Sequence, residues 1–175
     1  VLAEVALPAL PEPVLPALER PWNTVVTGIG GTGVLTVSAI LGMAAHLEGK
    51  GCTVLNQSGL AQKFGPVVSH VRIGRRQADI HAVRVAAGDA DLLLGCDLVV
   101  SAAEDPLAKV NIERSHAIVN DFESPTAAFT RDPDAVFPAE AMKARIREEV
   151  GADKTAFVDA TAIATALLGD AIAAN

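Results

Sequence analysis

The stretch from Thr24 to Glu48 constrains the fold of this 175-residue chain more than any other part of the sequence. Residues 24–27 (TVVT) form a β-branched run that is typical of a buried strand. A G-x-G-x-x-G loop at residues 28–33 (GIGGTG) follows, and then an apolar segment long enough for a helix. Strand, glycine loop and helix in this order are the context in which such a loop binds a dinucleotide or another phosphate.

The N-terminus of the predicted helix makes this loop a candidate phosphate site. Its first N–H groups have no partner inside the helix and carry the positive end of the helix dipole. Glycines let the backbone turn sharply and let a phosphate approach without a Cβ in the way. The alternative is that Gly28, Gly30 and Gly33 serve only the tight turn and the close packing of helix on strand.

The residues after the next strand disfavour NAD as the ligand. A NAD site has an acidic residue about 20 positions beyond the loop, at the end of the second strand, where it holds the ribose. The second predicted strand is 52–55 and ends in Asn56 and Gln57, whereas Glu48 lies earlier, inside the helix. A different phosphate-bearing ligand remains compatible with the loop.

The rest of the sequence predicts an α/β fold, Rossmann-like and doubly wound, with a mainly parallel sheet and an antiparallel hairpin at one edge. Segment 56–66 is rich in Gly, Pro and amide side chains and is predicted as a loop at the ligand-binding edge. Segments 67–74 and 79–85 alternate apolar and polar residues and are predicted to pair as the hairpin. The other predicted elements are strands at 97–101, 117–120 and 155–159, helices at 105–115, 138–150 and 161–174, and a long loop at 122–137.

Composition and charge argue against several classes of partner. Half of the residues are hydrophobic and only 3% are aromatic, which fits helices packed closely on a mainly parallel sheet. The formal charge is −7, and no basic cluster exceeds Arg75-Arg76, which argues against a nucleic acid or an anionic membrane as partner. No apolar run has the length needed to cross a bilayer.

The cysteines and the proline-rich start bound the chain's organisation. Cys52 and Cys96 form no C-x-x-C pair, which argues against an iron–sulfur cluster or another metal site within the chain. Reduced thiols suit a cytoplasmic protein. Residues 1–21 are rich in proline and are predicted to be an extended linker before a domain at 22–175, as in a piece cut from a larger protein.

A few polar residues are candidates for contact with a ligand. Lys63 lies in the loop expected to face the glycine turn and can pair with a phosphate as a point charge, although an ordinary solvated lysine fits equally. His70 is more typical of a hydrogen-bonded structural histidine, and Asp159 of a helix cap. No pairing of nucleophile and base is recognisable, so no catalytic residue is predicted.

The stretch from Val26 to Gly74 resembles the gamma domain of 2-oxoacid:ferredoxin oxidoreductases, and most of all the fused indolepyruvate ferredoxin oxidoreductase type. The segments GLAQKFGPVVSHVRIG (59–74) and GDADLLLGCDLVV (88–100) carry the resemblance more specifically than the glycine loop does. It extends from Trp22 to the end of the chain. Phe64 stands where the family usually has a second glycine.

The resemblance implies an enzyme that oxidatively decarboxylates 2-oxo acids, here aryl pyruvates, to acyl-CoA. It implies thiamine diphosphate and iron–sulfur clusters in other domains, ferredoxin as electron acceptor, and a gamma domain that contributes to coenzyme A binding and to assembly of the active site. It further implies that this domain alone is inactive and that its partners are other domains or subunits of the same oxidoreductase. The residues expected to line the coenzyme A edge are Gly28, Gly30, Gly31, Thr32, Gly33, Gln62, Lys63 and Ser69.

Two other functions remain open from the sequence. The chain could be a structural module that joins catalytic domains and binds no small molecule. It could also be a free-standing nucleotide-dependent enzyme, either a dehydrogenase or an adenylating enzyme. The missing ribose carboxylate counts against the dehydrogenase, and Asn56 and Lys63 stand where an adenylating enzyme has an aspartate and an arginine.

Overall fold

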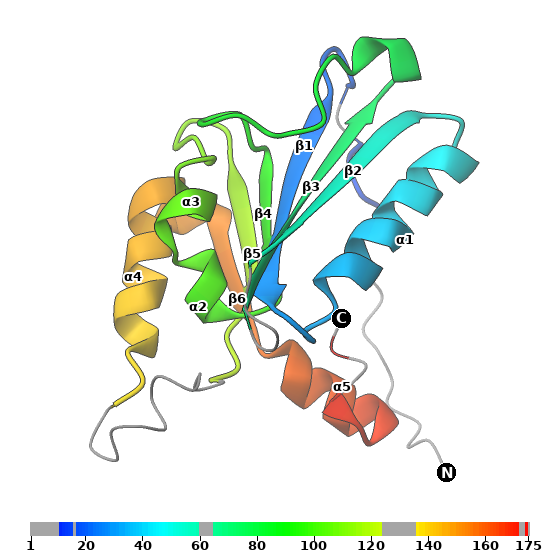
Figure 1. Ribbon diagram of the computed structural model, residues 1–175. Helices are drawn as coiled ribbons and strands as arrows, with labels where there is room; N and C mark the ends of the chain where they lie inside the picture. Colours follow the sequence, from blue (N-terminus) through cyan, green and yellow to red (C-terminus); the bar gives the residue numbers. More distant parts are fainter. Residues whose placement is uncertain (1–10, 16, 60–64, 124–135, 172–173, 175) are drawn as a thin grey trace.

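The computed structural model describes residues 11–15, 17–59, 65–123, 136–171 and 174. They form a six-stranded sheet of strand order β2-β3-β1-β4-β5-β6, with helices on both faces (Figure 1). The strands are β1 (Trp22–Ile29), β2 (Gly51–Ser58), β3 (Pro66–Gly74), β4 (Leu92–Gly95), β5 (His116–Asn120) and β6 (Thr155–Val158). The helices are α1 (Val34–Leu47), α2 (Leu98–Ser101), α3 (Glu104–Leu107), α4 (Ala139–Val150) and α5 (Ala160–Leu168), with short 3-10 turns η1 (Gln77–Asp79) and η3 (Ala152–Lys154).

Strand β1 is central in the sheet, and its sequence explains why. Every residue from Asn23 to Ile29 is buried, as expected for an apolar and β-branched strand covered on both faces. β1 pairs in parallel with β4 and antiparallel with β3. The predicted strand, glycine loop and helix are therefore confirmed, with α1 beginning directly after Gly33.

The predicted class of sheet is also confirmed. β1, β2, β4, β5 and β6 run in one direction, and β3, among the described strands, runs against them. The β2–β3 hairpin puts β2 at one edge of the sheet, whereas β6 forms the other edge. The carboxyl ends of β1, β2, β4, β5 and β6 consequently meet at one edge, which we call the carboxyl edge.

The predicted composition of the hairpin is wrong. Segment 67–74 does form β3, but β3 pairs with β2 on one side and β1 on the other. Neither side of β3 is free, so segment 79–85 cannot pair with it as predicted. The chain instead turns through η1 after β3, and residues 80–86 form no strand.

The predicted strand at 97–101 is wrong as well. The strand is β4, just before it, and Leu98–Ser101 is the short helix α2. A short apolar run cannot be assigned to strand or helix by periodicity alone. The deciding residue is Asp97, whose side chain caps α2 by accepting the N–H of Val100 at 2.9 Å.

The predicted helix at 105–115 is much shorter in the structure, because α3 ends at Leu107. Side chains after it bind the backbone in place of helical partners. Ser115 Oγ accepts the N–H of Asn111 at 2.7 Å, and Asn111 Oδ1 accepts the N–H of Glu113 at 2.9 Å. Such local hydrogen bonds compete with helix formation.

The last elements agree with the sequence. β5, α4 and β6 lie where strands and a helix were predicted, and Asp159 caps α5 by accepting the N–H of Ala162 at 2.7 Å. α5 is shorter than predicted because Gly169, at a φ of 75°, ends it. Of the predicted loop at 122–137, residues 124–135 lie outside the described residues.

Neighbouring strand residues point to opposite faces of the sheet, so each face has its own apolar core beneath its own helices. Val26 packs with Val34 of α1 and with Val67 and Val71 of β3. The other face forms the larger core, under α2 and α4 (Figure 1). Its buried members include Val25, Leu93, Leu98, Val119, Ile146 and Val150.

At the end of the sheet opposite the carboxyl edge, Arg20 forms an ion pair with Asp91, whose side chain is only 3% exposed. Asp91 also accepts the N–H of Asn23 at 2.8 Å. The end of the proline-rich segment is thereby fixed to the domain. None of the helices in the described ranges is both long enough and apolar enough to span a membrane.

We predict that Leu93→Ala lowers the free energy of unfolding by about 2–5 kcal/mol, because Leu93 is fully buried between the strands and the α2–α4 layer. Urea unfolding measures the change. Leu47→Ala removes the same atoms from a side chain that is 79% exposed and serves as the control, with an expected change within about 0.5 kcal/mol. Equal losses in the two variants would contradict the assigned core.

Candidate functional site

The loop between β1 and α1 is held by its own hydrogen bonds. Thr32 donates both its backbone N–H and its hydroxyl to the carbonyl of Ile29, at 3.0 and 2.7 Å. Gly31 and Gly33 have φ values of 104° and 81°, in the left-handed region that favours glycine. The loop therefore has a defined shape that depends on glycine at these two positions.

The N-terminus of α1 carries no side-chain cap. Gly33 is its N-cap residue, and the first turn contains no acidic side chain. Helix geometry leaves the first N–H groups without intrahelical acceptors, and the dipole places partial positive charge there. The N-terminus of α1 therefore offers free N–H donors and partial positive charge, the two features that bind an anion.

This helix end lies at the topological switch point of the sheet. From β1 the chain passes through α1 on one face, and from β4 it passes through α2 and α3 toward β5 on the other (Figure 1). In open α/β sheets, ligands bind in the crevice where adjacent connections diverge in this way. At this switch point residues 96–97 after β4 lie beside the glycine loop after β1, and Cys96 donates its N–H to the carbonyl of Thr27 at 2.7 Å.

Gly28 has a packing role at this point. A Cβ on Gly28 would lie 2.3 Å from Thr32 Oγ1 and 2.7 Å from Val34 Cγ2. Glycine here lets the loop and α1 approach β1 closely, which is the packing interpretation of the motif. Gly31 differs, since a Cβ there would meet nothing within 4 Å and Gly31 is exposed.

The predicted residues from the β2–β3 loop are described only in part. Gly30 donates its N–H to the carbonyl of Gly65 at 2.8 Å, so one end of that loop touches the glycine turn. Gln62 and Lys63 lie outside the described residues. Their contact with a ligand stays a prediction.

Ser69 lies within the sheet and not at its edge. It is fully buried, pairs with Val26 of β1, and donates its hydroxyl to Asn56 Oδ1 at 2.7 Å. It points to the face covered by α1, as Val67 and Val71 do. The structure thus gives the hydroxyl a partner inside the sheet, and its predicted contact with a ligand stays a prediction.

His70 faces the opposite side of the sheet and is fully buried. Its Nδ1 accepts the N–H of Val85 at 3.2 Å, and its Nε2 lies 2.8 Å from Gln57 Oε1. Because Nδ1 accepts, the neutral ring carries its proton on Nε2 and donates it to Gln57. Burial, together with the positive charges of Lys109 and Arg84, lowers the pKa of His70 from 6.5 to about 4. His70 is therefore a structural histidine.

A family model described as pyruvate ferredoxin/flavodoxin oxidoreductase matches residues 23–175. The chain belongs to this family. The resemblance found in the sequence is thereby confirmed for nearly the whole length of this oxidoreductase domain.

Curated relatives of the domain are oxidoreductase subunits. It is 38% identical over 80 residues to the indolepyruvate oxidoreductase subunit IorB of Thermococcus kodakarensis, covering 46% of this chain and 38% of that subunit. It is 29% identical over 130 residues to the same subunit of Methanothermobacter thermautotrophicus, covering 74% of this chain and 63% of that one. The chain thus spans less than two thirds of the length of either relative.

Solved structures share the fold of the domain. The pyruvate oxidoreductase subunit PORC of Thermotoga maritima superposes with a TM-score of 0.59 at 19% identity, covering 89% of this chain and 71% of that one. The keto/oxoacid ferredoxin oxidoreductase gamma subunit of Geobacter sulfurreducens gives 0.56 at 16% identity, covering 87% and 70%. The 2-oxoglutarate:ferredoxin oxidoreductase of Magnetococcus marinus, with 2-oxoglutarate, coenzyme A and succinyl-CoA bound, gives 0.56 at 13% identity, covering 84% and 21%.

Sequence reasoning missed Asn120, which joins the carboxyl-edge loops of the domain. Its Nδ2 donates to the carbonyl of Cys96 at 3.3 Å and to Thr161 Oγ1 at 3.2 Å. Its Oδ1 accepts the N–H of Ala160 at 3.2 Å. Asn120 thereby links the loops after β4, β5 and β6. The available signal was its position, since an Asn or Asp stands at or directly after the end of β5 and of β6.

Residues 96–97 follow β4 at the switch point. Asp97 is 4% exposed, and burial raises the pKa of its carboxyl, while the N–H groups of Val100, Ile29 and Val99 oppose that rise. Burial, and then the charge of Asp97, raise the pKa of the Cys96 thiol to about 11. Cys96 is therefore a protonated thiol near neutral pH and no nucleophile.

We predict that His70 makes the protein less stable below neutral pH. Its pKa is about 4 in the folded protein and ordinarily 6.5, so the unfolded chain takes up a proton first as the pH falls between these values. From about pH 7.5 to about pH 5, this lowers the free energy of unfolding by about 2 kcal/mol. Urea unfolding at the two pH values should show this loss.

His70→Gln should remove that part of the pH dependence, and His46→Gln, an exposed histidine on α1, should retain it. An unchanged pH dependence in His70→Gln would show that His70 binds its proton as easily in the folded protein as in the unfolded one.

Proposed function

We propose that this chain is the gamma domain of an indolepyruvate or related 2-oxoacid:ferredoxin oxidoreductase and that it binds coenzyme A at the glycine loop. The observation that carries the proposal is the uncapped N-terminus of α1 at the switch point. Membership of the family supports it, as does coenzyme A in the related Magnetococcus enzyme.

The residues at the loop fit one of the phosphates of coenzyme A. Gly31 is exposed beside the first turn of α1, with open space where a side chain would stand. The first turn has no acidic side chain to repel an anion. Asp97, which follows β4 beside the glycine loop, is buried and is held in place as the cap of α2.

The domain has a binding role in the proposed enzyme. We assign residues 22–175 to it and residues 1–21 to an extended linker. Thiamine diphosphate and iron–sulfur clusters belong to other domains or subunits, where they supply carbanion chemistry and electron transfer to ferredoxin. We propose that the domain alone is inactive and that it completes a cytoplasmic enzyme that converts a 2-oxo acid to its acyl-CoA.

We predict that the chain binds coenzyme A in a calorimetric titration and that Gly31→Ala weakens this binding about tenfold or more. A side chain at a φ of 104° strains the loop and occupies the approach to the N-terminus of α1. Gly49→Ala is the matched control, because Gly49 has a φ of 69°, equally open space, and lies at the far end of α1. Its affinity for coenzyme A should equal that of the unchanged chain.

Titrations with NAD and ATP complete this experiment. Heat from either of them without heat from coenzyme A would contradict the proposal and favour a free-standing nucleotide-dependent enzyme. No heat from any of the three would favour the structural module that joins catalytic domains.

Gln62 and Lys63 are proposed as further direct contacts, and Ser69, buried in the sheet, as a residue that supports the site through Asn56, which accepts its hydroxyl. We predict that Lys63→Ala weakens coenzyme A binding about tenfold, because a lysine–phosphate hydrogen bond is charge-assisted. Lys50→Ala is the control, since Lys50 pairs with Glu48 beyond the end of α1. If Lys63→Ala binds coenzyme A as tightly as the control, Lys63 is not part of the site.

A further inference from the structure

Helix α1 has an unusual composition for an outer-layer helix. Its 14 residues, VLTVSAILGMAAHL, include no aspartate, glutamate, lysine or arginine. α4, which covers the other face of the sheet, has the sequence AEAMKARIREEV, with six charged residues among 12. A helix that is apolar on all sides is normally buried on all sides. In this structure α1 covers the sheet with one side only.

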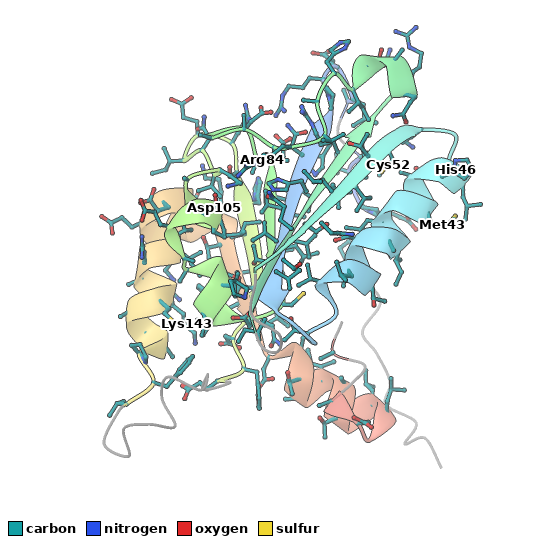
Figure 2. All side chains as sticks on the ribbon, in the orientation of Figure 1. Met43, His46, Cys52, Arg84, Asp105 and Lys143 are labelled. Carbon is teal, nitrogen blue, oxygen red and sulfur yellow. The ribbon has the colours of Figure 1, made fainter. Side chains whose placement is uncertain are left out.

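The outward side of α1 carries a row of large apolar side chains. Ile40, Met43 and Leu47 follow the spacing of one helix face and are 60%, 58% and 79% exposed, and Leu35 is 53% exposed. Figure 2 shows Met43 and His46 on the side of α1 away from the sheet. We call Leu35, Ala39, Ile40, Met43, Ala44 and Leu47 the α1 face; all six are exposed.

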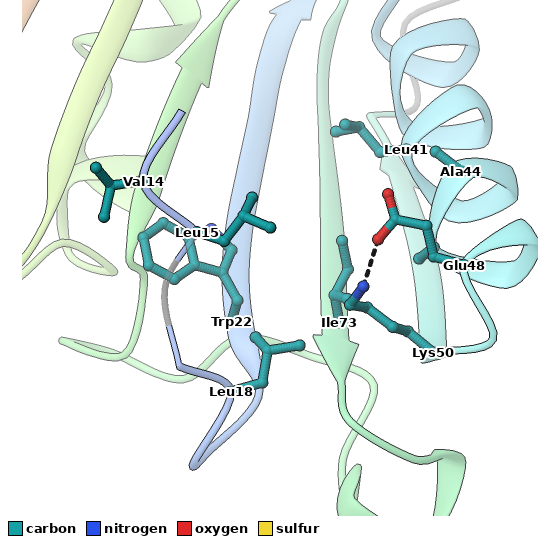
Figure 3. Close-up of a pocket in the computed structure, with 10 residues that line it drawn as sticks. Val14, Leu15, Leu18, Trp22, Leu41, Ala44, Glu48, Lys50 and Ile73 are labelled. Atoms are coloured by element: carbon teal, nitrogen blue, oxygen red, sulfur yellow. Dashed lines mark hydrogen bonds and ion pairs between the residues drawn. The ribbon is translucent and has the colours of Figure 1, made fainter. Parts of the chain in front are cut away.

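A groove continues this apolar surface (Figure 3). It has a volume of about 580 Å³. The second half of α1 contributes Leu41 and Ala44 to its lining, and the segment before β1 contributes Leu15 and Leu18. The ion pair between Glu48 and Lys50 lies among the lining residues.

We infer that the α1 face and this groove form the surface by which the domain docks onto an uncharged, apolar surface of another domain or subunit of the same oxidoreductase. Exposed apolar patches of this kind mark interaction sites. The α1 face carries no charged side chain, and Glu48 and Lys50 in the groove pair with each other, so the partner is recognised by apolar contact and not by ion pairs.

The size of the α1 face favours another domain or subunit of the oxidoreductase, and not a second copy of this chain, as its partner. A helix of 14 residues is about 21 Å long and about 10 Å wide, so it offers a few hundred square ångströms. A stable interface between free partners buries about 800 Å² on each side. The face by itself falls short, but it is sufficient where the partner is also held by other contacts or by the chain.

The comparisons agree with such an arrangement. The relatives are oxidoreductase subunits, and the match in the Magnetococcus enzyme covers 21% of a much longer chain. The inference rests on the part of the proposed function that places this chain in a larger oxidoreductase. It does not depend on coenzyme A binding, so failure of one leaves the other standing.

Cysteine labelling tests the inference. Met43→Cys on the α1 face and Ile112→Cys in the turn before β5 form a matched pair, because both native side chains are 58% exposed. Each variant is treated with a maleimide, as the separate chain and within the whole oxidoreductase. Peptide mass spectrometry reads the label at each position separately from Cys52 and Cys96.

We predict similar labelling of both positions in the separate chain. In the whole oxidoreductase, labelling of Met43→Cys should slow at least tenfold, while that of Ile112→Cys should change less than twofold. Labelling of Met43→Cys that is as fast in the whole enzyme as in the separate chain would overturn the inference. Protection of Met43→Cys in the separate chain would overturn it too: protection lost on dilution would identify a second copy, and protection kept on dilution would identify other residues of this chain.

A second pair of variants tests the function of the contact. Met43→Glu should release the domain from the oxidoreductase or abolish turnover, because it places a charge in an apolar interface. Ile112→Glu should leave assembly and turnover unchanged. The urea midpoint of the separate chain should be unchanged in both, since both side chains are exposed. Full assembly and turnover with Met43→Glu would overturn the inference.

Discussion

The arrangement of the carboxyl edge depends on the absence of a side chain at Gly28. The atoms nearest to a Cβ there belong to Thr32 in the loop, Val34 in α1 and Cys96 after β4, at 2.3, 2.7 and 3.0 Å. Their convergence sets the spacing between the two loops of the switch point. Any larger residue would separate β1 from α1 or from the loop after β4. The position of the helix N-terminus is therefore fixed by packing before any ligand arrives.

Sequence alone could predict the elements whose signals are local. The β-branched run of β1, the glycine loop and the cap at Asp159 each specify their own conformation. It could not predict that β3 inserts between β1 and β2, because both sides of a strand are open to pairing until the tertiary structure fills them. The same limit explains the errors at 79–85 and at 97–101, where alternation or an apolar run fits more than one structure.

The residues of the candidate site likewise include some with a local sequence signal and some whose roles depend on distant partners. Gly31, Thr32 and Gly33 could be placed in the loop between β1 and α1 from the sequence, because a G-x-G-x-x-G run after a β-branched strand is a local signal. Ser69 and His70 are adjacent in sequence, yet they point to opposite faces of the sheet, where Asn56 and Gln57 bind them. Their roles depend on partners contributed by β2, which no spacing in the sequence reveals. Asn120 was missed because its partners come from the loops after two other strands.

The lack of charged side chains on α1 affects how the separate domain behaves in solution. The net charge of −7 keeps the chain in solution by mutual repulsion, but that charge lies on other surfaces. At high ionic strength the repulsion is screened, whereas attraction between apolar faces is not. Salts that strengthen apolar association would then precipitate the separate domain. The surface that we propose for assembly would then be a source of insolubility in isolation.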